Sequence, residues 1–174
     1  MEIAVNDVKK HFEDAGDYID LVDKLVLPQT QNLDNLINNI KTLVQQPNCL
    51  IANEVLEHNY LNLSTELYLM IDKLKEFEIY SAFAKANEGE AYNNAYLTES
   101  TSADKKPAVA ELQIRAELKS KKESVVNAIY SSAFKTIKNK IDAGNLVADT
   151  LKNIIKNRTS IDFTTNQTNN NRSN

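Results

Sequence analysis

Hydrophobic residues recur at every third or fourth position along most of this chain, which is the spacing of one face of an α-helix. The pattern predicts a helix over residues 3–26, ended by Pro28, and a shorter helix over about 30–45. It continues from about 49 to 88, and the stretch from Leu63 to Phe77 has nearly the heptad spacing of a coiled coil. The first half of the chain is therefore predicted to be helical.

In the second half of the chain the same spacing predicts two further helices after a loop. It fades over residues 92–104, which we predict to form a loop, and returns over 105–143 as the longest uninterrupted helical pattern. Gly144 stands where such a helix commonly ends, because glycine is favoured just after the last helical turn. A final helix is predicted over about 145–157, and residues 158–174 show no regular hydrophobic spacing.

These elements predict an all-α fold, an elongated antiparallel helical hairpin with N-terminal helices packed against it. We expect three parts: acidic N-terminal helices in 1–47, the long hairpin and a terminal helix in 48–157, and a disordered Asn/Thr-rich tail in 158–174. Only three glycines and three prolines occur, which favours a few long helices. A single hairpin cannot bury both faces of its helices, so either the N-terminal helices or other copies of the chain must cover them. We therefore also expect a homo-oligomer.

Cysteine use and hydropathy indicate the compartment. Cys49 is the single cysteine, so an intrachain disulfide is impossible and a reducing compartment is expected. The N-terminus lacks the basic and then apolar regions of a signal peptide. No apolar run reaches the roughly 20 residues that span a bilayer. The prediction is a cytoplasmic protein without membrane contact, in the host-cell cytoplasm if a phage encodes it.

Residues that could carry catalysis or bind a metal are scarce. A nucleophile needs a base close by, yet His11 and His58 are the only histidines and neither lies beside a nucleophile motif. Glu54 and His58 are one turn apart, but the Glu-x-x-His motif of di-iron carboxylate sites does not occur. Glycine-rich phosphate loops and zinc-ligand spacings are also missing. The sequence predicts no enzyme, no cofactor and no metal site.

Charge is distributed unevenly along the chain. Residues 1–100 contain 7 Lys/Arg against 17 Asp/Glu, whereas residues 101–174 contain 13 against 7. Two interpretations are open: the two halves attract each other, or the second half meets an anion such as nucleic acid.

A basic cluster lies in the second half of the chain. Arg115, Lys119 and Lys122 occupy positions i, i+4 and i+7, so they share one helix face and could follow a phosphate backbone. Charges on helices are more often solvated or paired with acidic neighbours, and that alternative stays open. The candidate residues for contact with nucleic acid or another anion are Lys105, Lys106, Arg115, Lys119, Lys121 and Lys122.

Further basic and aromatic residues occur along the same predicted helix. Lys135, Lys138 and Lys140 follow two turns later. Tyr130 and Phe134 are four residues apart and would stack on bases if exposed, although aromatic residues with this spacing are typical of a core.

The order of elements over residues 50–155 resembles the UvsY proteins, the recombination mediators of T4-like phages. An amphipathic helix with the pair Leu67-Tyr68 leads to a loop bearing Tyr and Asn, and Ser102-Ala103-Asp104-Lys105 precedes a long helix that ends near Ile137-Lys138. The resemblance implies an oligomeric, non-enzymatic protein that binds single-stranded DNA and helps to load a recombinase.

A second hypothesis stays open beside this one. An acidic, glycine-poor helical chain is also typical of a phage structural or scaffolding protein, or of a protein that binds a phage or host protein as an inhibitor or a DNA mimic. In that case the acidic N-terminal helices would meet the partner.

Overall fold

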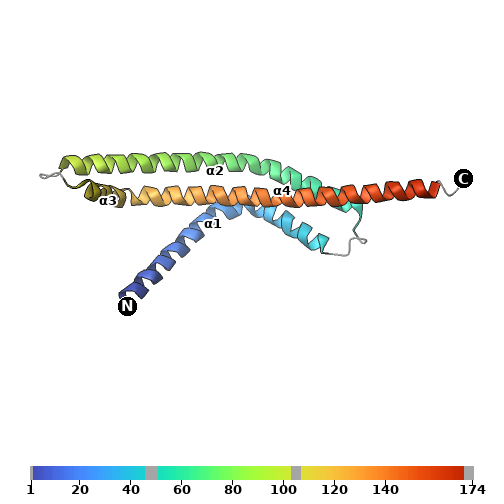
Figure 1. The fold of residues 1–174 in the computed structure, drawn as a ribbon, viewed down its shortest axis with the longest axis horizontal. Coiled ribbons are helices and arrows are strands. Elements are labelled where there is room, and N and C mark those ends of the chain that lie inside the picture. Colours follow the sequence, from blue (N-terminus) through green and yellow to red (C-terminus); the bar gives the residue numbers. More distant parts are fainter. Residues whose placement is uncertain (1, 46–50, 103–106, 171–174) are drawn as a thin grey trace. The chain divides into compact units, whose positions relative to one another are not determined.

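The structure is a computed structural model that describes the backbone of residues 2–45, 51–102 and 107–170, with side chains described within 16–45, 51–101 and 107–159. The described backbone is helical almost throughout and contains no strand, so the predicted all-α fold is confirmed. Four helices follow one another in this part of the chain (Figure 1): α1 (Glu2–Val44), α2 (Asn53–Ser102), α3 (Val109–Lys119) and α4 (Lys121–Asn170).

The chain divides into two compact units, and the border crosses the helices instead of following the loops. Unit 1 contains Met1–Pro28 and Lys73–Ile137, and unit 2 contains Gln29–Asp72 and Lys138–Asn174. Helices α1, α2 and α4 each contribute to both units. Each unit is therefore built from segments that lie far apart along the chain.

Side chains from α1, α2 and α4 form the core of unit 2. Gly144 of α4 lies within it, where an added Cβ would be 2.7 Å from Leu67 Cδ2 and 3.3 Å from Leu33 Cδ1. The glycine thus leaves room for leucines of α1 and α2, and the prediction that it ends a helix is wrong. The fully buried side chains of this core include Leu33, Ile40, Leu56, Leu63, Met70 and Leu151.

Polar contacts join the same segments of unit 2. The ammonium group of Lys140 donates a hydrogen bond to Oγ1 of the fully buried Thr30 at 3.0 Å and forms an ion pair with Asp34. Arg158 donates a hydrogen bond to the carbonyl oxygen of Ile51 at 2.7 Å. Both contacts satisfy polar groups that would otherwise lose water on burial.

Unit 1 contains the predicted antiparallel hairpin. Ser81 and Glu88 of α2 hydrogen-bond with Ser131 and Asn127 of α4 at 3.0 and 2.5 Å, so residue numbers rise along one helix as they fall along the other. The hydroxyl of Tyr18 in α1 donates a hydrogen bond to the backbone carbonyl of residue 128 in α4. The N-terminal helix therefore packs against the hairpin, as expected.

Pro28 does not end the first helix, and that prediction is wrong. Helix α1 continues through Pro28 to Val44. Proline removes one backbone donor and crowds the preceding turn, at a cost of about 3 kcal/mol in a helix interior. Val26, Thr30 and Leu33 are buried on one face around the proline. Their burial offsets the lost hydrogen bond, since a fully buried aliphatic side chain contributes about 1.5–3 kcal/mol.

Three other predicted boundaries differ from the structure. Residues 92–102 belong to α2 and form no loop, and hydroxyls such as that of Thr98 bond to carbonyls four residues earlier within the helix. The helix predicted over 105–143 is interrupted at Ser120, whose φ and ψ are −90° and 4°. Helix α4 also extends beyond residue 157 to Asn170, where we expected a disordered tail.

Candidate nucleic-acid interface

The sequence-predicted basic cluster lies where α2 ends, α3 follows and α4 begins, all within unit 1. Arg115 and Lys119 lie on α3, and Lys121 and Lys122 open α4. The other two candidates, Lys105 and Lys106, lie outside the described residues.

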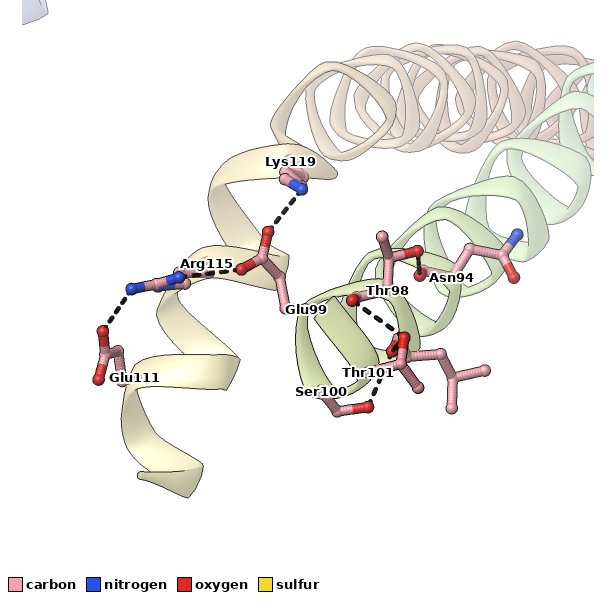
Figure 2. A network of polar contacts seen from close by, with 9 residues as sticks. Asn94, Thr98, Glu99, Ser100, Thr101, Glu111, Arg115 and Lys119 are labelled. Carbon is pink, nitrogen blue, oxygen red and sulfur yellow. Dashed lines mark hydrogen bonds and ion pairs between the residues drawn. The ribbon is translucent and has the colours of Figure 1, made fainter. Parts of the chain in front are cut away.

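Glu99 of α2 joins the two α3 cations (Figure 2). Its Oε2 is 3.1 Å from Nη1 of Arg115, and its Oε1 is 2.5 Å from Nζ of Lys119. Arg115 also pairs through Nη2 with Oε1 of Glu111 at 2.6 Å, one turn earlier on α3. The Glu99 side chain is 15% exposed, against 48% for Arg115 and 54% for Lys119, so the carboxylate lies beneath the two cations.

These contacts alter the acidity of the groups involved. Hydrogen bonds from Lys119 and then from Arg115 lower the pKa of the Glu99 carboxyl. Hydrogen bonds to Glu99 and then to Glu111 raise the pKa of the Arg115 guanidinium. Both shifts favour the charged forms of Glu99 and Arg115, and the nearby carboxylates offset part of the positive charge of α3.

Lys121 and Lys122 differ from the two α3 cations. Both side chains are exposed, and within the described residues neither forms a hydrogen bond or an ion pair. Arg115 and Lys119 are one turn apart and share a face of α3, and Lys122 lies beyond Ser120 on α4; we call these three residues the cationic edge. Lys121 and Lys122 are consecutive in α4, where neighbouring side chains point about 100° apart. The predicted cluster is thus split between two faces.

Ser120 separates α3 from α4. It is buried, with φ and ψ of −90° and 4°, its N–H donates to the carbonyl of Ala116, and its own carbonyl accepts from the N–H of Ser124 at 3.0 Å. These hydrogen bonds end α3 and begin α4, so sequence spacing alone does not carry a face of α3 onto α4.

Of the other candidates named from the sequence, Lys135 is exposed, and the rest are engaged elsewhere. Lys138 pairs with Asp142 at 3.3 Å, while Lys140 belongs to the core network of unit 2. Tyr130 is half-buried and packs against Tyr80, with ring centroids 5.6 Å apart. Phe134 is also half-buried. These aromatic side chains support packing, not an open surface for stacked bases.

Sequence reasoning missed a set of exposed apolar side chains in unit 1. Leu97 of α2 and Ile114 and Leu118 of α3 are 60%, 58% and 68% exposed. The sequence of α2 does contain a sign of them, because apolar residues occur on two opposite sides of this helix. One side remains exposed when the other packs into the hairpin.

Other kinds of site find little support in the part of the chain that the structure describes. There, groups of three or more His, Cys, Asp or Glu that could hold a metal do not occur. Nε2 of His58 lies 3.0 Å from the side-chain nitrogen of Asn62, one turn later on α2. Of the described helices, none combines the length and the apolar character that crossing a membrane requires.

Comparison with protein-family models, with curated proteins and with solved structures finds no match for this chain.

Proposed function

We propose that this chain is a non-enzymatic, oligomeric helical accessory protein of DNA recombination or replication, of the phage mediator type that residues 50–155 resemble. In this proposal it binds single-stranded DNA along the cationic edge and a recombinase elsewhere on its surface. The observation that supports it most is that three exposed cations, Arg115, Lys119 and Lys122, lie at the junction of α3 and α4.

One chain alone would bind DNA weakly. Arg115 and Lys119 form ion pairs with Glu99 and, for Arg115, also with Glu111. Among the described residues this leaves Lys122 as the unpaired cation of the cationic edge. Each neutralised phosphate contributes only modestly to the affinity for single strands. Several copies that bind one strand together raise the affinity without any new contact. The proposal therefore requires the oligomer as well as the lysines.

The test is fluorescence anisotropy with a labelled single-stranded oligonucleotide at low salt. Wild-type protein is expected to bind, and Lys122→Ala to bind several-fold more weakly. Lys135→Ala is the matched control, since Lys135 is an exposed lysine of α4 that lies off the cationic edge. If the wild type does not bind, or if the two variants lose affinity equally, the cationic edge is not a DNA site.

A second candidate function is favoured by the acidic part of α1. There Asp17, Asp20 and Asp23 are exposed beside Ile19 and Leu27, which are 58% and 53% exposed. Such a mixed acidic and apolar surface suits a protein partner, as in a scaffolding or inhibitory protein. Co-purification distinguishes the two functions: recovery with capsid or tail proteins, or with a host enzyme, would favour this second candidate.

A further inference from the structure

A groove of about 380 Å³ runs between α2 and α4 within unit 2. Its floor is apolar, since Leu67, Ile141 and Ala148 are buried. Polar and aromatic side chains form the rims above this floor. The full lining is Tyr60, Ser64, Leu67, Tyr68 and Ile71 of α2, with Ile141, Asn145, Ala148 and Asp149 of α4.

The two helices that form the groove are antiparallel. A Cβ added at Gly144 of α4 would be 2.7 Å from Cδ2 of Leu67 in α2, so these two residues lie opposite each other. Arg158, further along α4, donates a hydrogen bond to the carbonyl oxygen of Ile51, which precedes Leu67 in the chain. Residue numbers therefore rise along α4 as they fall along α2.

This direction sets particular residues of the two rims at the same level. Asp149 follows Gly144 by five residues, and the position five residues before Leu67 lies between Tyr60 and Ser64. Since both helices rise by 1.5 Å per residue, Asp149 lies at the level of this turn of α2. Tyr60 and Asp149 thus form one end of the groove, and Tyr68 belongs to the other.

The groove carries a negative charge. Asp149 is exposed, and among the described residues it forms no hydrogen bond or ion pair, not even with Lys152 three positions later. The side chains that line the groove include no lysine or arginine. Ser64, Asn145 and the tyrosine hydroxyls add oxygen acceptors on both rims. The charge and the acceptors favour a cationic ligand with several hydrogen-bond donors over a phosphate.

The two tyrosines divide the groove into two parts. Tyr60 is half-buried beside Asp149, and the face of an aromatic ring attracts a cation, above all a guanidinium that can stack on it. Tyr68 and Ile71 at the other end are 71% and 43% exposed and suit an apolar group. Eight residues of helix place the two tyrosines about 12 Å apart, so one ligand side chain does not reach both rings.

We propose that this groove is a docking site for a protein partner that presents an arginine next to an apolar residue. The guanidinium lies on the ring of Tyr60 and pairs with Asp149, while the aliphatic part of the arginine side chain covers the apolar floor. The neighbouring apolar residue contacts Tyr68 and Ile71. Arginine suits the site better than lysine, because its planar group has five donors and binds a carboxylate through two parallel hydrogen bonds.

This inference rests on the proposed function, in which the chain binds a recombinase as well as DNA, and it names the surface for that protein partner. The groove belongs to unit 2, whereas Arg115, Lys119 and Lys122 belong to unit 1. The two sites share no residue, so each can be altered without changing the other.

A pair of short peptides tests the choice of ligand. The probe is Gly-Leu-Arg-Leu-Gly, and its control contains citrulline in place of arginine, which keeps nearly the same shape without the charge. In NMR titrations with the full-length chain, the arginine peptide should bind at least about tenfold more tightly than the citrulline peptide, because only the guanidinium forms a charge-assisted pair. Equal affinities would overturn the cation site.

Removal of one carboxylate tests the place of binding. Asp149→Asn should weaken binding of the arginine peptide about tenfold, since the guanidinium loses its ion-pair partner. Glu54→Gln is the matched control, because Glu54 is an exposed carboxylate of α2 that does not line the groove. It should leave the affinity unchanged. Equal losses in the two variants would show that the peptide responds only to the acidity of the chain, and the proposal would fail.

Two substitutions of one tyrosine test the aromatic contact. Tyr60→Leu should bind the arginine peptide several-fold more weakly, whereas Tyr60→Phe keeps the ring and should bind nearly as the wild type does. Circular dichroism checks that both variants are folded. Unchanged binding by a folded Tyr60→Leu variant would overturn the contact between the guanidinium and the ring.

Anisotropy with labelled single-stranded DNA separates this inference from the proposed function. Asp149→Asn and Tyr60→Leu should bind DNA as the wild type does. An arginine peptide that does not bind, while DNA does, overturns the groove alone. Peptide binding without DNA binding supports the groove and removes the DNA-binding part of the function. Weaker DNA binding by Tyr60→Leu would indicate bases stacked on the tyrosine and would overturn the assignment to a protein partner.

Discussion

At the scale of single residues, Glu99 controls how much of the cationic edge is available to an anion. Its carboxylate accepts hydrogen bonds from both Arg115 and Lys119. We predict that Glu99→Gln, which keeps the shape but removes the charge, raises affinity for single-stranded DNA several-fold and makes it more sensitive to salt. Anisotropy titrations at two salt concentrations measure both effects. Unchanged or weaker binding by a folded Glu99→Gln variant would show that DNA does not contact these cations.

The same carboxyl makes stability depend on pH. Its pKa is lowered in the folded chain from the ordinary 4.5, so its contribution is present at neutral pH and is lost as pH falls below that value through the folded pKa. Between pH 7 and pH 3 the wild type should therefore lose more stability than the Glu99→Gln variant, as measured by thermal unfolding. Equal losses in the two proteins would indicate that the contact contributes nothing measurable.

Two glycines within helices give opposite predictions. Gly89 is exposed, and an added Cβ would meet nothing within 4 Å, so Gly89→Ala should stabilise by about 0.5–1 kcal/mol through helix propensity. At Gly144 the same gain is opposed by overpacking against Leu67 and Leu33, which typically costs about 1–3 kcal/mol. Thermal unfolding should show a higher Tm for Gly89→Ala and a lower Tm for Gly144→Ala. A higher Tm for both would mean that the leucines move aside freely.

At the scale of helices, Pro28 destabilises the element that contains it. It lies exposed in the interior of α1, so its replacement loses little packing and restores one backbone hydrogen bond. We expect Pro28→Ala to stabilise the chain by about 2 kcal/mol. Helix propensity favours alanine by about 3 kcal/mol, but part of this gain is lost because proline restricts the unfolded chain and alanine does not. Gln31→Ala, at an exposed position one turn later, is the control in thermal or urea unfolding. A gain no larger than that of the control would show that α1 accommodates the proline without cost.

Helix content was predictable because burial of one helix face imposes a spacing of three or four residues on the sequence. Helix ends were less predictable, because Pro28 and Gly144 are local stop signals that packing with distant segments overrides. The common face of Arg115 and Lys119 also follows from spacing. Glu99 could not be foreseen as their partner, since it lies on another helix, in a segment that local composition predicts to be a loop.

At the scale of the whole molecule, assembly and DNA binding should depend on each other. Lys122→Ala removes one unpaired cation per chain and should reduce the slope of log affinity against log salt by about 0.7 for each chain bound to the strand. Dilution of the wild-type protein leaves the cationic edge intact but separates the copies of the proposed oligomer. At concentrations where the oligomer dissociates, DNA binding should therefore weaken more than it does on Lys122→Ala, and it should return at high concentration. Sedimentation and anisotropy on the same samples measure the two equilibria together. DNA affinity that stays constant while dilution dissociates the oligomer would show that single chains bind DNA independently.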